Sequence, residues 1–510
     1  MRCRRNWAKA TGRAAPRDLA IIAGVVPRLC LSGPALFVAL ACAGQNLSEQ
    51  IGALLASAPA NRAFWGVQVL DLDRGQVLAQ FNAQHFFVPA SNTKLFTTAL
   101  ALMRLGPDYR FQTRVLADRL PDGEGRLRGD LRLVGGGDPT LSNRAYPYRK
   151  GPKTGDPLQG IEELADQVVR TGLRRIEGDV VGDDTAYLWE PYPEGWTLDD
   201  ALWEYGAPVS ALTVNDNVIE IRLQAGTEAP VALTMSPPLD YYLVDSRLRV
   251  EPGDGRIWIE RLPGSRQLRL WGSLAPRQQR QLLIAIDDPA LYAARALAEA
   301  LRRRGVAICG QVAARHRYSN EAGTVLREQT GVELARRSSP PLVEVLRVID
   351  KVSQNLHAEL VLREVARLRR NQGSRQAGLE ELGAWLDEIG VRRGEYRFLD
   401  GSGLSRLNLV TPASVVQLLA YMYRSPYREA WLSLLPIGGE DGTLSGRFAG
   451  AAPARRIRAK TGTLSLSNAL SGYVESSRGM LAFAILSNNY LGPAADVRST
   501  IDKMALLMTE

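Results

Sequence analysis

The sequence predicts an α/β protein in which a large strand-rich segment interrupts a domain of helices and strands. Helical periodicity follows Ser91 near the beginning of the chain and returns after about residue 335. Between them, residues 109 to 318 show short alternating strands and turns rich in Gly, Pro and Asp. A chain of 510 residues, 45% hydrophobic and 23% charged, has room for about two to four folded domains.

The first 43 residues have the pattern of an export signal. Seven basic residues precede the apolar run LCLSGPALFVALACA, which ends in small residues and is too short to span a membrane as a mature helix. Cleavage at residues 39–41 or 41–43 satisfies a small-x-small rule. Lipidation of Cys42 is the weaker alternative, because residues 39–41 lack leucine where lipidation sites usually have it. We expect an exported protein of the periplasm or cell envelope, with membrane association at most peripheral.

Composition argues against several classes of function. Without residues 1–43 the formal net charge falls from +9 to about +3, and no lysine-rich or aromatic-interleaved basic stripe remains, so nucleic-acid binding is not expected. Cys309 is the one cysteine after the leader, which leaves no internal disulfide and no cysteine zinc site. His85, His316 and His357 lack metal-ligand spacing. We therefore expect neither a metal nor another cofactor.

The elements before and around Ser91 follow from local patterns. Residues 46–58 form an amphipathic helical pattern, and FWGVQVLDLDRGQVLAQFN alternates like a hairpin that turns at residues 73–75. A helix follows Ser91 and should end at Gly106, which Pro107 follows.

The remaining elements define the expected domains. Helices are predicted at about 158–172 and 288–304 within the strand-rich segment, and a smaller β module at about 217–278. After residue 335 two helices are predicted over SQNLHAELVLREVARLRR and TPASVVQLLAYMYRS, followed by strand, strand, strand and helix over RRIRAKTG, ALSGYVES, MLAFAILSNN and VRSTIDKMALLM. We expect residues 44–108 and 319–510 to form one split domain, with 109–318 inserted as a second.

A serine and a lysine lie one helical turn apart at the start of the Ser91 helix. Only seven of the 63 basic residues are lysines, and Lys94 is one of them. A lysine, unlike an arginine, can lose its proton inside a protein, and three positions along a helix place it on the same face as Ser91. For a lone S-x-x-K, however, a solvated helix lysine is the more common explanation.

Two further motifs turn this pair into a candidate active site. Ser353-Gln354-Asn355 is expected to open the 353–370 helix, and Lys460-Thr461-Gly462-Thr463 lies in a predicted strand. The order S-x-x-K, S-x-N, K-T-G is that of serine β-lactamases and penicillin-binding proteins, with Gln354 in place of Asp. A second copy, Lys153-Thr154-Gly155, lies among glycines and prolines without a strand pattern, and we regard it as incidental. The copy at 460 leads into two strands and can lie on a sheet edge that faces a bound peptide.

The nucleophile and base follow from elementary chemistry. The Ser91 hydroxyl reacts only when a neighbour takes its proton, and Lys94 can do so if its pKa falls from about 10.4 to near neutrality. Burial and the nearby charge of Lys460 both act in that direction. Ser353 can then pass the proton to the leaving amine, and Asn355 can bind Lys94 and the substrate backbone.

Other groups of the motifs would bind the substrate. The backbone N–H groups of Ser91 and Thr463 would stabilise the developing oxyanion, each by about 3 kcal/mol. Lys460 and Thr461 would bind a terminal carboxylate.

On these motifs the sequence resembles low-molecular-mass class C penicillin-binding proteins, the D-alanyl-D-alanine carboxypeptidases/endopeptidases of peptidase family S13. The resemblance extends over essentially the whole mature chain, and its carriers are FVPASNTKLFTTALAL, LRGDLRLVGGGDPTLS, YGAPVSALTVNDN, KVSQNLHAELVLRE, LDGSGLSRLNLVTP, LLPIGGEDGTLSGR and AKTGTLS. The long separation of Lys94 from Ser353 matches the domain that this family inserts there.

The resemblance implies a fold and an activity. It implies a transpeptidase-like domain with helices around an antiparallel sheet, hydrolysis of the terminal D-Ala-D-Ala bond of peptidoglycan stem peptides or of D-Ala-to-diaminopimelate cross-links, and acylation of Ser91 by β-lactams. Asp200 matches an acid that meets the free amine of the stem in some members; a helix-capping or surface acid is the equal alternative. Arg406, Asn408 and residues 439–442 resemble loops that shape the cleft. Asp138 reads as a turn residue, and His357 as helix surface or local packing.

Two other functions compete with this one. A β-lactamase or esterase of the same superfamily would deacylate quickly, but no deacylating glutamate can be placed and the large insertion disfavours it. A slow peptidoglycan-binding scaffold would not need a base beside its nucleophile, and the chain has both.

Overall fold

The computed structural model describes residues 46–228, 230–262, 264–321, 330–448 and 450–510. The expected leader, residues 1–43 with Cys42, lies outside these ranges. None of the helices in these ranges combines the length and the apolar composition that a membrane span requires.

A five-stranded antiparallel sheet joins the two ends of the described chain. Its order is β19-β20-β21-β1-β2, so the first hairpin pairs through β1 with the last strand of the C-terminal meander. The strands are β1 (Phe64–Asp71), β2 (Gln76–Phe81), β19 (Ile457–Leu464), β20 (Ser467–Ser476) and β21 (Gly479–Asn488). The strand with the Lys460 motif, β19, is therefore an edge strand, as the sequence predicts.

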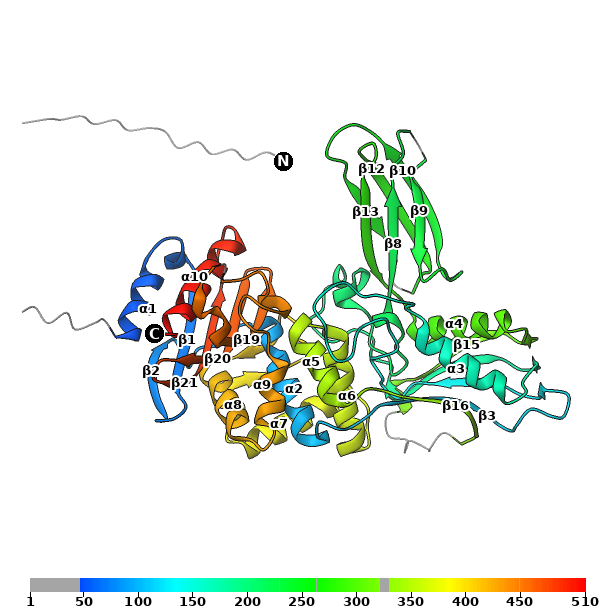
Figure 1. Cartoon of the computed structure of the whole chain (residues 1–510), viewed down its shortest axis with the longest axis horizontal. Helices are drawn as coiled ribbons and strands as arrows, with labels where there is room; N and C mark the ends of the chain where they lie inside the picture. Colours follow the sequence, from blue (N-terminus) through cyan, green and yellow to red (C-terminus); the bar gives the residue numbers. More distant parts are fainter. Residues whose placement is uncertain (1–45, 229, 263, 322–329, 449) are drawn as a thin grey trace, which may run out of the picture. The chain divides into compact units, whose positions relative to one another are not determined.

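Helices cover both faces of this sheet (Figure 1). Helices α1 (Leu47–Ala56) and α10 (Ala494–Leu507) pack on one face, and α2 (Thr93–Leu105), α5 (Leu342–Val352), α6 (Asn355–Arg370), α7 (Arg375–Glu388), α8 (Pro412–Arg424) and α9 (Arg428–Leu434) form the layer on the other. Alternate residues of β21 serve the two layers: Phe483 and Ile485 face α10, and Ala484 and Leu486 face the larger helical layer. Burial on both faces explains why this strand is a nearly continuous apolar run.

The segment between α2 and α5 forms a second, mixed sheet of order β15-β7-β5-β3-β16. Its strands are β3 (Gln112–Ala117), β5 (Leu131–Val134), β7 (Val180–Leu188), β15 (Val312–Arg317) and β16 (Val332–Ser338), and helices α3 (Gln159–Arg170) and α4 (Pro289–Arg303) pack with it. A small sheet of β4 (Arg126–Leu127), β6 (Arg175–Ile176) and β14 (Ala307–Ile308) lies beside them. Because β16 pairs with β3, this sheet extends beyond the expected end of the insertion at residue 318.

The nested β module consists of two three-stranded sheets, β13-β8-β9 and β10-β12-β11. Its strands are β8 (Val218–Gln224), β9 (Ala232–Ser236), β10 (Leu243–Val250), β11 (Ile257–Glu260), β12 (Gln267–Leu274) and β13 (Gln279–Ala285), seen at the top of Figure 1. The expected limit at residue 278 misses β13, which pairs with β8 over its full length.

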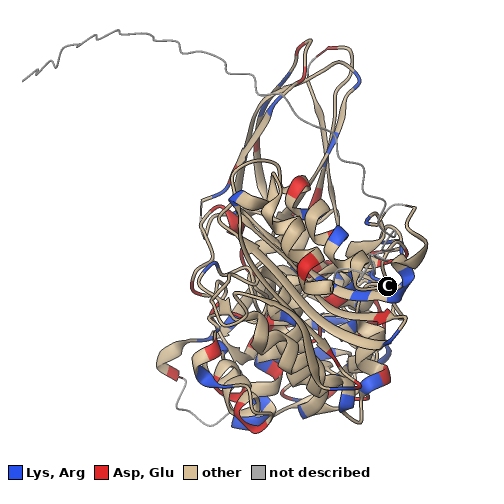
Figure 2. Cartoon of the chain, turned by 90° about the vertical axis from the view of Figure 1, so that its left-hand side faces the viewer, with Lys and Arg blue, Asp and Glu red and all other residues tan. Residues whose placement is uncertain are grey.

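Charged residues of both signs are interspersed on the face that Figure 2 shows, without a broad region of one sign. This distribution agrees with the small net charge of the sequence after residue 43.

Candidate active site

Ser91 lies in a short 3-10 turn, Ala90–Asn92, directly before α2. Asn92 anchors this turn to the sheet, because its Nδ2 donates to Ser471 Oγ of β20 at 2.7 Å. Gly462 of β19 passes on the other side, where a Cβ would come within 2.6 Å of the Pro89 carbonyl oxygen. Glycine therefore lets the edge strand run close to the serine.

Lys94 is fully buried in the first turn of α2. Its Nζ lies 3.0 Å from Ser91 Oγ, 2.6 Å from Asn355 Oδ1 and 2.5 Å from the carbonyl oxygen of Ser402. A neutral amine at this position can donate to Asn355 Oδ1 and to the Ser402 carbonyl oxygen and still accept the proton of the Ser91 hydroxyl.

The surroundings of Lys94 favour this neutral form. Burial, together with the charge of Lys460, lowers the pKa of Lys94 to about 7, although Asp400, Asp350 and Glu359 act in the opposite direction. A substantial share of the lysine is thus unprotonated near neutral pH.

The Ser353-Gln354-Asn355 motif is a turn between two helices, and the expectation that it opens a helix at Ser353 is wrong. Ser353 ends α5 in the left-handed conformation, with φ of 63°, and α6 begins at Asn355. Gln354 is the N-cap, since its side chain accepts a hydrogen bond from the backbone of Leu356. The turn places the Ser353 hydroxyl 2.9 Å from Lys460 Nζ.

Asn355 is held from two sides. Its Oδ1 accepts the hydrogen bond from Lys94, and its Nδ2 donates to the carbonyl oxygen of Tyr205, 2.8 Å away in the inserted segment. The insertion thus contributes directly to the geometry around the lysine.

Lys460 is fully buried on β19 and donates to Ser353 Oγ and to the Thr461 carbonyl oxygen, each at 2.9 Å. Burial lowers its pKa to about 8, while Asp350 opposes the change. The Thr461 hydroxyl donates to Thr443 Oγ1 at 2.8 Å.

A cavity of about 270 Å³ opens at the serine. Ser91, Thr463, Asn355, Gly403 and Leu404 line it, together with Asp200, Tyr205, Arg406 and Leu464. Asp200 is almost completely buried, accepts a hydrogen bond from Thr197 N at 2.8 Å and pairs with Arg406 at 3.2 Å. The structure therefore brings together the residues of the three motifs, and Asp200, which the family resemblance suggested, lies in the same cavity while also accepting a hydrogen bond from the local turn.

Several contributors were missed by sequence reasoning. Asp350 lies fully buried at the end of α5, and burial raises its pKa to about 7 even though Lys460, Lys94 and Lys351 lower it. Asp400 holds the loop that presents the Ser402 carbonyl, by accepting from the backbone N–H groups of Gly403 and Ser405 at 2.8 and 2.7 Å. Asp350 lies in α5, outside the helices predicted from the sequence, and no local pattern marks it.

Three residues outside the reaction centre also have defined places. His357 is completely buried and hydrogen-bonded to Asp216, so it belongs to packing and not to the helix surface. Asp138 accepts from Thr140 in a turn and is also paired with Arg337 at 2.9 Å. Asn408 supports the Asp400 loop through a hydrogen bond of 2.5 Å.

Within the described ranges, no three His, Cys, Asp or Glu side chains gather as a metal site requires. A lysine base and a serine nucleophile perform acyl transfer without such a site.

Known proteins are similar to this chain in sequence. Residues 47–510 match the model of the D-Ala-D-Ala carboxypeptidase 3 (S13) family. A D-alanyl-D-alanine carboxypeptidase of Actinomadura sp. (strain R39) is 34% identical over 478 residues, covering 91% of this chain and 85% of that protein. The D-alanyl-D-alanine carboxypeptidase DacB of Haemophilus influenzae is 27% identical over 458 residues, covering 86% and 88%.

Solved structures agree in fold. Penicillin binding protein 4 (dacB) of Haemophilus influenzae superposes with a TM-score of 0.77 at 24% identity, covering 89% of this chain and 97% of that chain. A complex of the same protein with a β-lactam superposes with a TM-score of 0.72 at 25% identity and the same coverage.

Fold and sequence together define a serine-type D-Ala-D-Ala carboxypeptidase. The chain belongs to the D-Ala-D-Ala carboxypeptidase 3 (S13) family.

Proposed function

We propose that this carboxypeptidase removes the terminal D-alanine of peptidoglycan stem peptides through an acyl-enzyme on Ser91, and that it also cleaves cross-linked stems. The observation that carries the proposal is the 3.0 Å separation of Lys94 Nζ from Ser91 Oγ, with the lysine fully buried. We propose that β-lactams acylate the same serine, as the complex of the Haemophilus relative suggests.

In the first step Ser91 Oγ attacks the carbonyl carbon of the scissile bond while Lys94 takes the hydroxyl proton. The oxyanion that forms is stabilised by the backbone N–H groups of Ser91 and Thr463, both of which line the small cavity. Each such donor is worth about 3 kcal/mol in the transition state.

In the second step the C–N bond breaks and the leaving amine receives a proton. Ser353 is the donor, because its hydroxyl accepts a hydrogen bond from Lys460, whose charge also acts on Lys94. The proton lost by Ser353 is replaced from the Lys94 side, so the lysine returns to its neutral form.

Water then enters and Lys94 acts again as the base. The water attacks the ester carbonyl, its proton passes to Lys94, and Ser91 leaves with a proton from the lysine. Lys460 and Thr461 bind the carboxylate of the terminal residue in the first half of the reaction.

Asp200 supports a preference for stems with a free amine. Asp200 lines the cavity of Ser91 and is paired with Arg406. Because the Arg406 side chain is 40% exposed to solvent, this pairing only partly neutralises the carboxylate. An ammonium group on the third residue of the stem would pair with this carboxylate.

For the architecture we propose a split catalytic domain of residues 44–108 and 339–510, with the inserted domain ending at Ser338 instead of 318. The pairing of β16 with β3 supports the later boundary. We also propose that the chain is exported and works in the periplasm or cell envelope, where its substrate is found.

The decisive experiment is labelling of the purified protein with a fluorescent penicillin, wild type beside Ser91→Ala, followed by mass analysis of a pentapeptide ending in D-Ala-D-Ala. A stable adduct on Ser91 and loss of one alanine establish the proposal. Rapid turnover of penicillin would indicate a β-lactamase, and the absence of both adduct and product would indicate a binding scaffold.

A further inference from the structure

A second and larger cavity lies on the other side of the reaction centre. It measures about 760 Å³, and Ser353, Gln354 and Asn355 form one of its walls. Residues 143 to 157, called the 143–157 loop below, contribute a second part of the lining. Strand β8 contributes a third part.

Asn355 and Tyr205 line both cavities and so divide them. Ser91 and Thr463 belong to the small cavity, and Ser353 to the large one. If Ser353 protonates the leaving amine, the chain attached to that amine extends into the large cavity. This step rests on the proposed function.

The volume of the large cavity fits a peptide. Cavities of roughly 300–1,000 Å³ take ligands of drug size, whereas a single alanine is far smaller. A leaving group that fills this space is the second stem of a cross-linked substrate.

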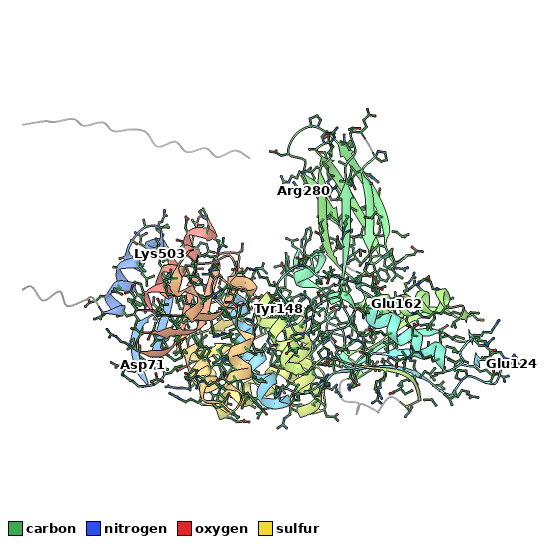
Figure 3. The ribbon with its side chains drawn as sticks, in the orientation of Figure 1. Asp71, Glu124, Tyr148, Glu162, Arg280 and Lys503 are labelled. Carbon is green, nitrogen blue, oxygen red and sulfur yellow. The ribbon has the colours of Figure 1, made fainter. Side chains whose placement is uncertain are left out.

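The 143–157 loop joins the insertion to the catalytic strand. Lys150 Nζ donates to the Glu440 carbonyl oxygen at 3.1 Å, and Tyr148 lies near the backbone of Gly442. Thr443, the next residue, contacts Thr461 of β19. Figure 3 shows Tyr148 at the α5 end of the insertion, far from Glu124 at the other end.

Lys153, from the Lys-Thr-Gly copy that the sequence analysis set aside, lies on this loop and lines the cavity. It pairs with Asp216, which is buried and also accepts hydrogen bonds from Arg144 at 2.8 Å and His357 at 2.9 Å. Arg144 binds one carboxylate oxygen and His357 the other, so Asp216 keeps a partner on both oxygens when Lys153 turns away. The Lys153 side chain is 35% exposed, so a ligand carboxylate in the cavity can compete with Asp216 for its ammonium group.

We infer that the large cavity holds the leaving stem of a cross-linked peptide and that Lys153 binds a carboxylate of that stem. Lys153 thereby determines specificity for cross-links. Glu204, which lines the same cavity, adds a negative group that suits the ammonium of the departing stem.

The test compares two substrates on the full mature protein: a cross-linked stem-peptide dimer and a monomeric pentapeptide. Lys153→Met should lower the ratio of dimer to pentapeptide kcat/KM about tenfold, equivalent to about 1.4 kcal/mol, mainly through a higher KM for the dimer. Lys153→Arg should restore the ratio. Arg149→Met removes a positive charge from the same loop at an exposed position outside the cavity lining, and it should leave the ratio at the wild-type value.

A dimer with amidated carboxylates on the leaving stem supplies the charge control. Wild type and Lys153→Met should cleave this amidated dimer with the same kcat/KM. An unchanged ratio in Lys153→Met, or an equal loss with the amidated dimer, overturns the inference. A wild type that cleaves the pentapeptide but not the dimer also overturns it while the carboxypeptidase function stands, whereas failure on both substrates without a penicillin adduct removes the proposed function itself.

Discussion

Lys94 Nζ lies 2.6 Å from Oδ1 of Asn355, although 261 positions of sequence separate the two residues. The same amide group donates to the Tyr205 carbonyl oxygen of the insertion. The insertion therefore fixes the orientation of the amide, and the amide helps to hold Lys94 Nζ beside Ser91.

The pKa values of the two buried lysines predict a bell-shaped pH profile of kcat/KM. Lys94 must be neutral to accept the serine proton, so the rate rises with pH through about 7, its pKa. Lys460 must be charged to bind the carboxylate, so the rate falls above about 8, its pKa. Steady-state cleavage of the pentapeptide from pH 5.5 to 10 measures both limbs, which belong to the interacting pair. A flat profile between pH 6 and 9 would contradict this assignment.

Asn355→Asp should move the acidic limb to higher pH. A carboxylate beside Lys94 stabilises the ammonium form, so the midpoint should rise by about one pH unit or more and penicillin acylation at pH 7 should slow about tenfold. Gln354→Glu is the matched control, because it adds the same charge one position away without contact to Lys94 and its carboxylate can still accept from Leu356 N. The prediction fails if both variants shift the midpoint equally.

Asp200→Asn should weaken substrates that carry a free amine on the third residue. Loss of the charge should lower kcat/KM about tenfold for such a peptide and much less for its N-acetylated form. Asp199→Asn removes a neighbouring acid that does not line the cavity and serves as the control. Equal losses on the two peptides would show that Asp200 acts only by holding Arg406 and Thr197.

Gly403→Ala should disrupt the reactive serine without unfolding the protein. Gly403 has φ of 82°, and a Cβ there would collide with the Ala90 carbonyl oxygen next to Ser91. A displacement of about 1 Å in a catalytic group can slow a reaction about 100-fold, and we expect a loss of that size in penicillin acylation. Gly446→Ala, where a Cβ meets nothing within 4 Å, should acylate at the wild-type rate. Near-normal acylation of Gly403→Ala would show that the turn adapts.

Arg363→Met should reduce the free energy of unfolding by about 3–5 kcal/mol, because it leaves a buried carboxylate without its partner. Arg363 and Glu359 are both completely buried and 2.9 Å apart. Burial already raises the pKa of Glu359, and a carboxylate with a raised folded-state pKa loses stability as pH rises. The deficit should therefore be smaller at pH 5 than at pH 7 in urea unfolding. Arg302→Met, which breaks an exposed pair with Glu299, should cost less than about 1 kcal/mol at either pH.

The parts of the site that could be predicted are the residues that belong to short local motifs. Ser91 and Lys94 lie three positions apart, so a helix places them on the same face. Lys460 lies in a strand pattern that predicts a sheet edge. The apolar run of β21 and the alternation of β1 likewise indicate strands, since burial selects those residues.

The parts that could not be predicted depend on distant chain segments. Ser353 occupies a left-handed turn, a conformation that few serines adopt and that no neighbouring residue signals. Asp350 and Asp400 matter because segments far apart in sequence exclude water from them and bring the lysines near. The first half of β13 is exposed and polar, so its membership in the nested module follows only from its pairing with β8.

The pairing of β1 with β21 has a consequence for the newly made chain. The nucleophile and its base are synthesised early, but the hairpin before them gains its neighbouring strand only when residues 479–488 have emerged. Lys460 is also synthesised long after Ser91 and Lys94. A chain still being synthesised or translocated therefore holds an unfinished reaction centre, and hydrolysis begins only after the last strands have joined the first.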